Sequence, residues 1–225
     1  NALLLGQVVV TGAGTTTTSE RLGAVPPAGF KIGATTKQMQ EYLGLPGPAA
    51  GFVPRESLRP DGATLRFADF LNVGVECEIG VRLGRDLPFG PCTRERAAEA
   101  VAAVHPAIEI VEKRYPADLA ALGTPTLIAD DFFNAGCVLG PAVHDWRGLD
   151  LAAIEGRMLI SGKEVGRGRG ADILGHPLEA LAWLSGSMAA RGRTLRAGEF
   201  VTLGSLVATT WVAAGDEVRI EVEGL

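Results

Sequence analysis

Cysteine is scarce in this chain, and long apolar runs are missing. The three cysteines, Cys77, Cys92 and Cys137, are odd in number and widely spaced, which matches neither a disulfide framework nor a zinc-ligand pattern. No apolar run approaches the roughly 18 residues of a membrane helix, and the opening NALLLGQVVV lacks the basic start and cleavage site of a signal peptide. These absences favour a reducing compartment, the cytoplasm, and predict no membrane partner.

Basic and aromatic residues are also few. The 21 Lys and Arg are outnumbered by 26 Asp and Glu, which gives a net charge of −5, so the footprint of a nucleic-acid-binding protein is absent. Only 8 Phe, 3 Trp and 2 Tyr are available for base stacking. Glycine, in contrast, is abundant: 30 of 225 residues is about twice the usual share of ~7%. This favours a strand-rich globular protein with many tight turns.

The chain shows no linker, repeat or long charge run, which predicts one domain over residues 30–225. We expect the preceding segment, 1–29, to be incomplete, because residue 1 is Asn and the tract 12–19 is low in complexity. Periodicity and end signals predict a mixed β structure with a few helices, an α+β fold. The expected helices are 36–43 (capped by Thr35), 93–104 and 177–190, and the expected strands are 73–83, 107–111, 137–140, 200–203, 206–212 and 218–222, with 44–54 as a loop and GRGRG (166–170) as a mobile turn.

Two glutamates lie on one face of the predicted strand 73–83. Side chains alternate along a strand, so Glu76 and Glu78 leave it on the same side. The plain alternative is a solvated strand face. Gly74 and Gly80 flank the pair on that face and leave room for something other than side-chain packing. Because adjacent like charges repel, a divalent cation is a natural partner for this pair.

A third carboxylate, Glu109, stands in the apolar segment AIEIV. A buried carboxylate is unfavourable unless it is paired or metal-bound, so a salt bridge to a basic residue is an equal alternative. Three carboxylates without His or Cys would suit Mg²⁺ or Mn²⁺ rather than zinc. Three protein ligands would also leave coordination positions open for substrate oxygens.

Lys31, in FKIGATT, lies just before the first predicted helix. A lysine beside a helix N-terminus makes a site suited to an anion. The alternative is an ordinary surface lysine. His176, in LGHPLEAL, is expected to cap or pack at the start of its helix rather than to act in catalysis.

The segments FKIGATTKQMQEYLGLPGP, VGVECEIGVRLGRDLP, HPAIEIVEKRY, LIADDFFNAGCVLGP and the stretch 166–218, in this order, resemble the 2-keto-4-pentenoate hydratase family. That family belongs to the fumarylacetoacetate hydrolase superfamily, together with 4-oxalocrotonate decarboxylases. The resemblance runs from residue 30 to the end. It implies a mixed β-roll or distorted barrel with flanking helices, assembled into homo-oligomers. It also implies metal ligands at Glu76, Glu78 and Glu109, a catalytic Lys31, and substrate contacts from Gly204, Ser205, Asp130 and Phe133.

The sequence departs from the family pattern in two places. The family hydratases carry an acidic residue in a Pro-Asp-aromatic-Gly stretch, where this chain has Ala49 and Ala50. That aspartate is associated with proton transfer beside the lysine. Where the family has the segment IADNAS, this chain has IADDFF, which ends in Phe132 and Phe133. The two aromatic residues predict a tighter and more apolar pocket at one end. Asp130 and Asp131 remain candidates for orienting Lys31 or a bound water.

Three functions are compatible with these residues. The first is a metal-dependent hydratase that adds water to a short 2-hydroxy-dienoate or 2-oxo-enoate, giving a 4-hydroxy-2-oxo acid, as in the catabolism of aromatic compounds. The second is a decarboxylase or C–C bond hydrolase acting on a 2-oxo diacid or β-diketone-like substrate. The third is a non-catalytic protein that binds a metal and a 2-oxo acid.

Overall fold

The computed structural model describes residues 27–116 and 119–225, so the low-complexity tract 12–19 lies outside the described residues. A seven-stranded mixed sheet has the order β2-β1-β9-β4-β5-β6-β3, and a three-stranded sheet has the order β10-β7-β8. The helices are α2 (Lys37–Leu43), α3 (Arg94–Ala100), α4 (Leu119–Leu122), α5 (Thr124–Ala129) and α6 (Pro177–Ala189). The strands are β1 (Gly29–Gly33), β2 (Ala49–Val53), β3 (Leu58–Pro60), β4 (Val73–Leu83), β5 (Val101–Glu112), β6 (Asn134–Leu139), β7 (Glu155–Ile160), β8 (Lys163–Arg169), β9 (Phe200–Trp211) and β10 (Val218–Val222).

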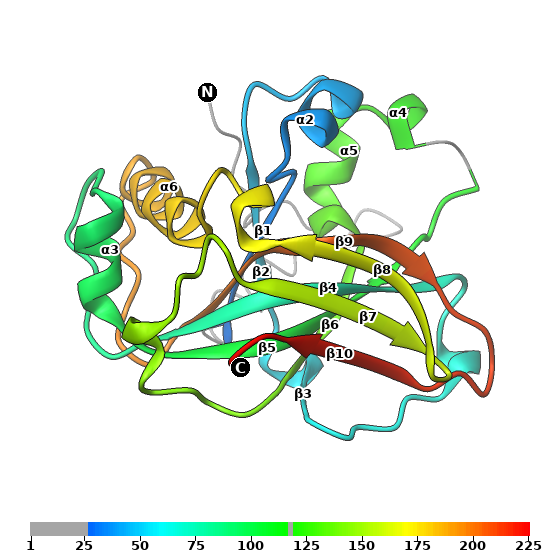
Figure 1. The fold of residues 1–225 in the computed structure, drawn as a ribbon. Helices are drawn as coiled ribbons and strands as arrows, with labels where there is room; N and C mark the ends of the chain where they lie inside the picture. Colours follow the sequence, from blue (N-terminus) through cyan, green and yellow to red (C-terminus); the bar gives the residue numbers. More distant parts are fainter. Residues whose placement is uncertain (1–26, 117–118) are drawn as a thin grey trace.

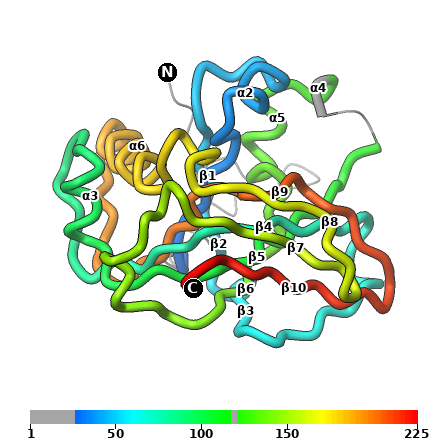
Figure 2. The backbone as a smooth tube through the Cα atoms, viewed as in Figure 1, coloured from blue at the N-terminus to red at the C-terminus, as the bar shows by residue number. Residues whose placement is uncertain are grey.

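The large sheet is strongly curled, and β1 and β2 run at a steep angle to β4 and β5 (Figure 1). This is the fold type that the sequence resemblance implies. β1 pairs in parallel with β9, although the two are far apart in the chain (Figure 2). The three-stranded sheet and α6 cover one face of the large sheet, and the main apolar core lies between them. The opposite face carries the three glutamates.

The strand predicted at 73–83 is confirmed with the same limits, as β4. The apolar side chains on one face of β4 pack in the main core, where Cys77, Ile79 and Val81 are fully buried. The two-residue alternation therefore turns Glu76 and Glu78 to the other face, because successive side chains of a strand point in opposite directions.

The loop predicted over 44–54 is wrong for its second half, which forms β2. Ala49 pairs with Gly33 and Gly51 pairs with Lys31, antiparallel to β1. The prolines and glycines of this stretch favour turns locally, but pairing with β1 decides the conformation of residues 49–53. Lys31 thus lies on strand β1, and helix α2 stands in the chain between β1 and its partner β2.

The helix predicted over 93–104 ends at Ala100, and Val101 begins the 12-residue strand β5. The alanines of this segment favour a longer helix. From Val101 onward, however, antiparallel pairing with β4, and further along with β6, gives a strand instead. Pro106 lies inside this strand. At the junction between α3 and β5, the Arg147 guanidinium donates a hydrogen bond to the Val101 carbonyl oxygen at 3.1 Å.

Other limits differ by smaller amounts. The cap of α2 is Thr36, whose hydroxyl accepts from the Met39 N–H, and not Thr35. The expected strands 200–203 and 206–212 form one strand, β9, and GRGRG is largely strand β8 rather than a mobile turn. His176 caps α6, as expected: its Nδ1 accepts from the Leu178 N–H at 3.1 Å. Among the described residues, no helix has both the length and the apolar character needed to span a membrane.

Glycine is required where the three-stranded sheet approaches β9. A Cβ on Gly168 would lie 1.8 Å from the Leu206 carbonyl oxygen. We expect Gly168→Ala to lower the free energy of unfolding by about 1–3 kcal/mol, because main-chain atoms must shift to relieve the overlap. Urea titration measures the change. Gly148→Ala is the control, since a Cβ there meets no atom within 4 Å; an equal loss in both variants would contradict the packing argument.

Candidate metal centre

Three carboxylates from two neighbouring strands meet on the face of the large sheet opposite the main core. Glu76 and Glu109 are direct partners in the β4–β5 register, and Glu78 is two residues along β4. One carboxylate oxygen from each of the three lies within 4.8 Å of the others. Glu78 and Glu109 are only 1% and 2% exposed. The solvated-face alternative is therefore wrong for Glu78.

Each glutamate is oriented by a hydrogen bond from a neighbouring strand. Glu78 accepts from the Gly204 N–H at 2.7 Å, and Glu76 accepts from the Thr209 hydroxyl, both on β9. Glu109 accepts from Asn134 Nδ2 of β6 at 2.9 Å. Thr209 and Asn134 were not recognised from the sequence. Only the strand order β9-β4-β5-β6 identifies them, because it places polar side chains beside the glutamates.

Lys31 completes the cluster. Its Nζ donates to Glu109 Oε1 at 2.8 Å, and the side chain is only 4% exposed. The surface-lysine alternative is therefore wrong, and the salt bridge considered for Glu109 is present alongside the carboxylate cluster. Burial by itself would lower the pKa of Lys31, but the charges of Glu109, Asp131 and Glu76 outweigh it and raise that pKa.

The electrostatics of the cluster favour a cation. Burial and the nearby Glu109 charge raise the pKa of Glu76 to about 7. Burial, Glu109 and Glu76 raise the pKa of Glu78 well above its ordinary value. Three carboxylates share one ammonium group, so the cluster holds more negative than positive charge when ionised. Oxygen donors in this arrangement fit a hard divalent cation such as Mg²⁺, Mn²⁺ or Ca²⁺.

The two glycines that flank the glutamates do not leave an open space. A Cβ on Gly74 would lie 2.9 Å from the Trp211 ring. A Cβ on Gly80 would touch the side chains of Ala107 and Leu139 at 3.6 Å. The Trp211 ring thus fills the space at Gly74, whereas a Cβ at Gly80 would make ordinary van der Waals contacts with its neighbours.

Gly204 and Ser205 lie beside Glu78, but their polar groups are engaged. The Gly204 N–H donates to Glu78, as described above. The Ser205 hydroxyl lies 2.6 Å from the Val207 carbonyl oxygen and 3.1 Å from that of Cys77. A substrate contact from Ser205 would therefore require its hydroxyl to exchange partners.

In the segment after α5, the aromatic side chain beside Lys31 is not the one that the resemblance implied. Phe133 packs in an apolar group with Tyr115, at 6.2 Å between ring centroids. The ring beside Lys31 is that of Phe132, whose centroid lies 5.8 Å from Lys31 Nζ. Asp130 is paired with Arg114 at 3.0 Å.

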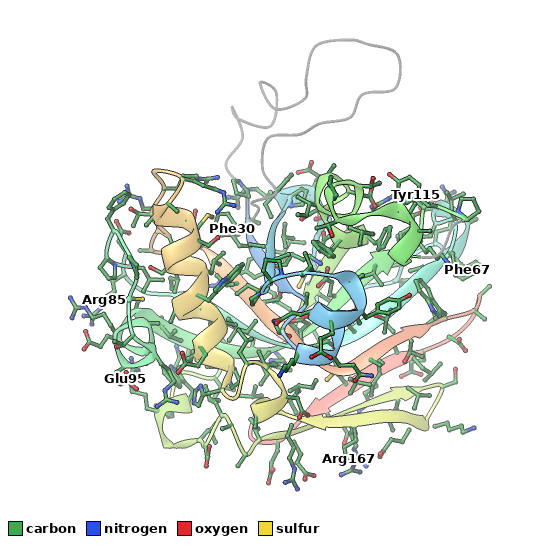
Figure 3. All side chains as sticks on the ribbon, turned by 90° about the horizontal axis from the view of Figure 1, so that it is seen from above. Phe30, Phe67, Arg85, Glu95, Tyr115 and Arg167 are labelled. Carbon is green, nitrogen blue, oxygen red and sulfur yellow. The ribbon has the colours of Figure 1, made fainter. Side chains whose placement is uncertain are left out.

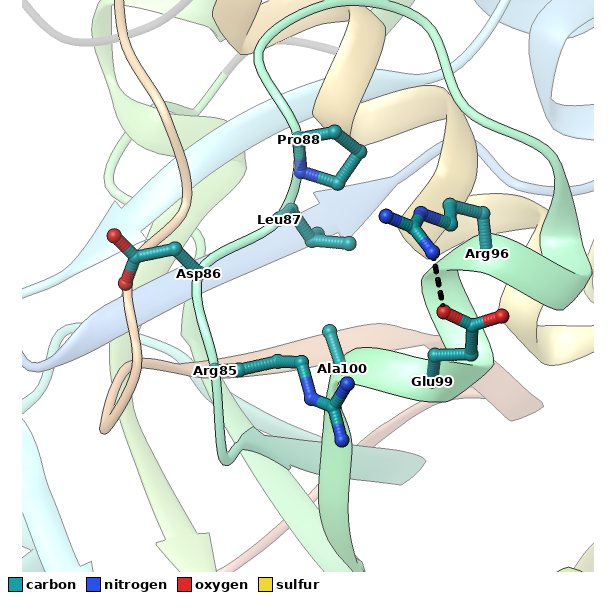
Figure 4. A pocket seen from close by; sticks show the side chains of 7 residues that line it. All are labelled: Arg85, Asp86, Leu87, Pro88, Arg96, Glu99 and Ala100. Atoms are coloured by element: carbon teal, nitrogen blue, oxygen red, sulfur yellow. Dashed lines mark hydrogen bonds and ion pairs between the residues drawn. The ribbon is translucent and has the colours of Figure 1, made fainter.

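A surface pocket of about 150 Å³ lies apart from this centre (Figure 4). It is lined by residues that include Arg85, Arg96 and Glu99, and Arg96 is ion-paired with Glu99 at 2.6 Å. Arg85 and Tyr115 lie on opposite sides of the molecule in Figure 3. None of the residues that line the pocket belongs to the glutamate cluster.

Metal affinity is expected to rise with pH between about 5 and 8, because Glu76 and Glu78 must lose protons to bind a cation. The limiting slope is about tenfold per pH unit for each proton released. The metal-free protein is expected to lose stability over the window from about pH 4.5 to 7. There the folded Glu76 holds a proton that the unfolded chain has lost, so rising pH favours unfolding.

Titration calorimetry with Mn²⁺ at several pH values, and urea titration in the presence of a chelator, measure these two trends. An affinity that does not change with pH would contradict the assignment of Glu76 and Glu78 as ligands.

Residues 6–225 match the family model described as fumarylacetoacetate (FAA) hydrolase C-terminal. Among curated relatives, 2-hydroxyhexa-2,4-dienoate hydratase of Comamonas testosteroni is 36% identical over 202 residues, covering 88% of this chain and 75% of the relative. The 2-keto-4-pentenoate hydratase of Paraburkholderia xenovorans (strain LB400) is 36% identical over 197 residues, covering 88% of this chain and 72% of the relative.

A solved structure of 4-oxalocrotonate decarboxylase from Pseudomonas putida G7, complexed with magnesium and adipate, superposes with a TM-score of 0.84. It is 28% identical, and the match covers 92% of this chain and 78% of the decarboxylase. That complex pairs a divalent cation with a dicarboxylic acid on the same fold.

Proposed function

The chain belongs to the fumarylacetoacetate hydrolase C-terminal family, and we propose that residues 30–225 form a divalent-metal-dependent hydratase domain. Its substrate would be a short 2-hydroxy-dienoate or 2-oxo-enoate, and its product a 4-hydroxy-2-oxo acid, as in the catabolism of aromatic compounds. Both hydratase relatives, at 36% identity, support this reaction.

The observation that carries the proposal is the buried carboxylate cluster with its single lysine. Glu76, Glu78 and Glu109 would hold the cation, and Mg²⁺ or Mn²⁺ would suit their hard oxygen atoms. When bound, such a cation acts as a Lewis acid that stabilises negative charge on the substrate's 2-oxygen. The protein's own side chains around the cation then have to bind the substrate's carboxylate and move protons along the substrate's carbon skeleton.

Lys31 is placed for part of that task. Its ammonium group points into the cluster and is fixed by Glu109, so it would face the anionic end of a substrate. The Phe132 ring beside it would cover the apolar part of the carbon chain and limit its length. The substrate-binding role that the sequence resemblance gives to Phe133 is thus assigned to Phe132 in this proposal.

Decarboxylation of a 2-oxo diacid is the second candidate. It is favoured by the likeness to 4-oxalocrotonate decarboxylase and by the alanines at positions 49 and 50, where an acidic residue is expected in a hydratase. Decarboxylation needs no base to activate water, so the missing aspartate would not impair it.

A two-substrate turnover assay separates these candidates. The protein is mixed with freshly generated 2-hydroxypenta-2,4-dienoate or with a 2-oxo diacid such as 4-oxalocrotonate, with Mg²⁺, with Mn²⁺ or with a chelator. Loss of the diene absorbance and release of carbon dioxide are recorded in parallel. Metal-dependent loss of the diene is the expected result. Carbon dioxide release from the diacid, without diene turnover, would identify a decarboxylase instead.

The three cysteines are free thiols, which supports a reducing compartment, and we propose that the protein is cytoplasmic.

We also propose a homo-oligomer. Size-exclusion chromatography with light scattering tests the assembly.

A further inference from the structure

Three consecutive residues between α5 and β6 have an unusual backbone. Asp131, Phe132 and Phe133 have φ angles of +56°, +47° and +64°, which lie in the left-handed region that few non-glycine residues adopt. Each such residue is unfavourable by about 1–3 kcal/mol and persists only where its surroundings enforce it. A turn of this kind therefore points to a side chain that has to be placed where a relaxed backbone would not put it.

Arg114 holds the turn from both ends. Its guanidinium donates to the Asp130 carboxylate at 3.0 Å and to the Asn134 carbonyl at 2.8 Å, and these two residues flank the left-handed stretch. Asn134 is the residue that donates to Glu109. The same clamp thus fixes the turn and a hydrogen bond to the metal centre.

The turn delivers the Asp131 carboxylate directly over Gly51, the register partner of Lys31. A Cβ at position 51 would lie 1.6 Å from Asp131 Oδ1 and 3.3 Å from Lys31 Cγ, so only glycine leaves room here for the Asp131 carboxylate. The main-chain N–H of Phe52 favours the charged form of the carboxylate. One carboxylate oxygen, Oδ1, is buried and has no hydrogen-bond partner among the described residues.

The other ionisable groups described around the cluster are poorly suited to accept a proton: Asp130 is already paired with Arg114. An ordinary lysine is protonated at neutral pH, and an ammonium group has no lone pair. The three glutamates are occupied by the cation in the proposed function. Asp131 is a carboxylate beside the cluster with an oxygen left without a partner.

We propose that Asp131 is the proton-transferring carboxylate of this site and acts beside Lys31 on the bound 2-oxo acid. Asp131 would take a proton from C3: an O–H bond forms as the C3–H bond breaks, the electron pair of the C3–H bond forms a C2–C3 double bond, and the π pair of the C2 carbonyl moves onto the 2-oxygen to give an enolate. Returning the proton reverses the step. The inference rests on the proposed function and explains how the chain manages without an acidic residue at positions 49–50.

The surroundings of Asp131 suit this task. Burial raises the pKa of its carboxyl group to about 8, although Lys31 opposes the rise. A group that titrates near neutral pH both accepts and returns protons efficiently.

Asp131→Asn tests the role with little disturbance. Asn is well tolerated in the left-handed region and has nearly the same shape as Asp, so it removes the proton acceptor with little change in packing. The probe is 2-oxopentanoate with Mg²⁺ in D₂O, where loss of the C3 proton signal by NMR reports proton transfer without hydration. We expect exchange to slow by about 10²–10⁴-fold, with the affinities for Mg²⁺ and 2-oxopentanoate within about threefold of the wild type.

Two further variants separate this role from a purely structural one. Gly51→Ala displaces the carboxylate without removing it and is expected to slow exchange at least about tenfold. Asp150→Asn makes the same chemical change in a carboxylate that accepts main-chain N–H groups elsewhere, from Ala152 and Ala153, and is expected to leave exchange unchanged.

Exchange at the wild-type rate in Asp131→Asn would overturn the inference and leave the proposed function standing. Absence of metal-dependent exchange in the wild type would contradict the proposed function itself, and the inference with it. If Asp131→Asn fails to fold, exchange at the wild-type rate in Gly51→Ala overturns the inference equally well.

Discussion

Glu78→Gln is expected to lower metal-dependent turnover by about 10³-fold or more and, at the same time, to stabilise the metal-free protein above neutral pH. The loss of turnover follows because a bound cation supplies several kcal/mol of charge stabilisation, and Glu78 is the most deeply buried of its three candidate ligands. Gln keeps an oxygen that accepts the Gly204 N–H, so the strand contact at 2.7 Å is retained.

The gain in stability has a definite sign. The pKa of Glu78 is raised by burial and by the charges of Glu109 and Glu76. A raised carboxyl pKa means that stability is present at low pH and declines as the pH rises through the folded value. Removing the charge removes that decline, so the unfolding midpoint with chelator should exceed that of the wild type at about pH 8 and match it more closely at about pH 5.

Turnover assays and thermal unfolding with and without Mg²⁺ measure the two effects. Glu221→Gln is the matched control, because it makes the same change on a strand of the other sheet, where Glu221 pairs with Arg157. Full metal-dependent turnover in Glu78→Gln would show that the cluster is not the metal centre.

Lys31→Met is expected to lower both turnover and stability. Removing one partner of a buried ion pair leaves the other charge uncompensated, which costs about 3–5 kcal/mol. Lys31 and Glu109 are both nearly inaccessible to solvent, so water cannot replace the lost contact. Turnover should fall by about 10²–10⁴-fold, the usual range for a group that assists proton transfer.

The metal provides an internal test of this explanation. Because a divalent cation would compensate the charge of Glu109, saturating Mg²⁺ should recover more stability in Lys31→Met than in the wild type. Urea titrations with Mg²⁺ and with chelator measure this. Lys37→Met, on the exposed face of α2, is the control; an equal loss of stability there would argue against the ion-pair explanation.

Features that depend on local periodicity could be predicted from the amino-acid sequence. Alternation along residues 73–83 predicted β4 with its observed limits and turned Glu76 and Glu78 to one face, because side-chain direction in a strand depends only on the backbone. The apolar surroundings of Glu109 in AIEIV likewise indicated that its carboxylate needs a partner. The helix at 177–190, with His176 at its start, followed from the same local signals.

The tertiary structure alone decided which partners these residues have. Glu109 meets Glu76 through strand register, and it meets Lys31 across 78 residues of sequence. No local pattern encodes such pairings. Residues 49–53 and 101–106 became strands for the same reason: pairing with distant strands outweighs the turn and helix preferences of the local sequence. Asp131 lies over Gly51, the register partner of Lys31, only because a clamped left-handed turn and a glycine on another strand coincide, and that combination exists only in the folded chain.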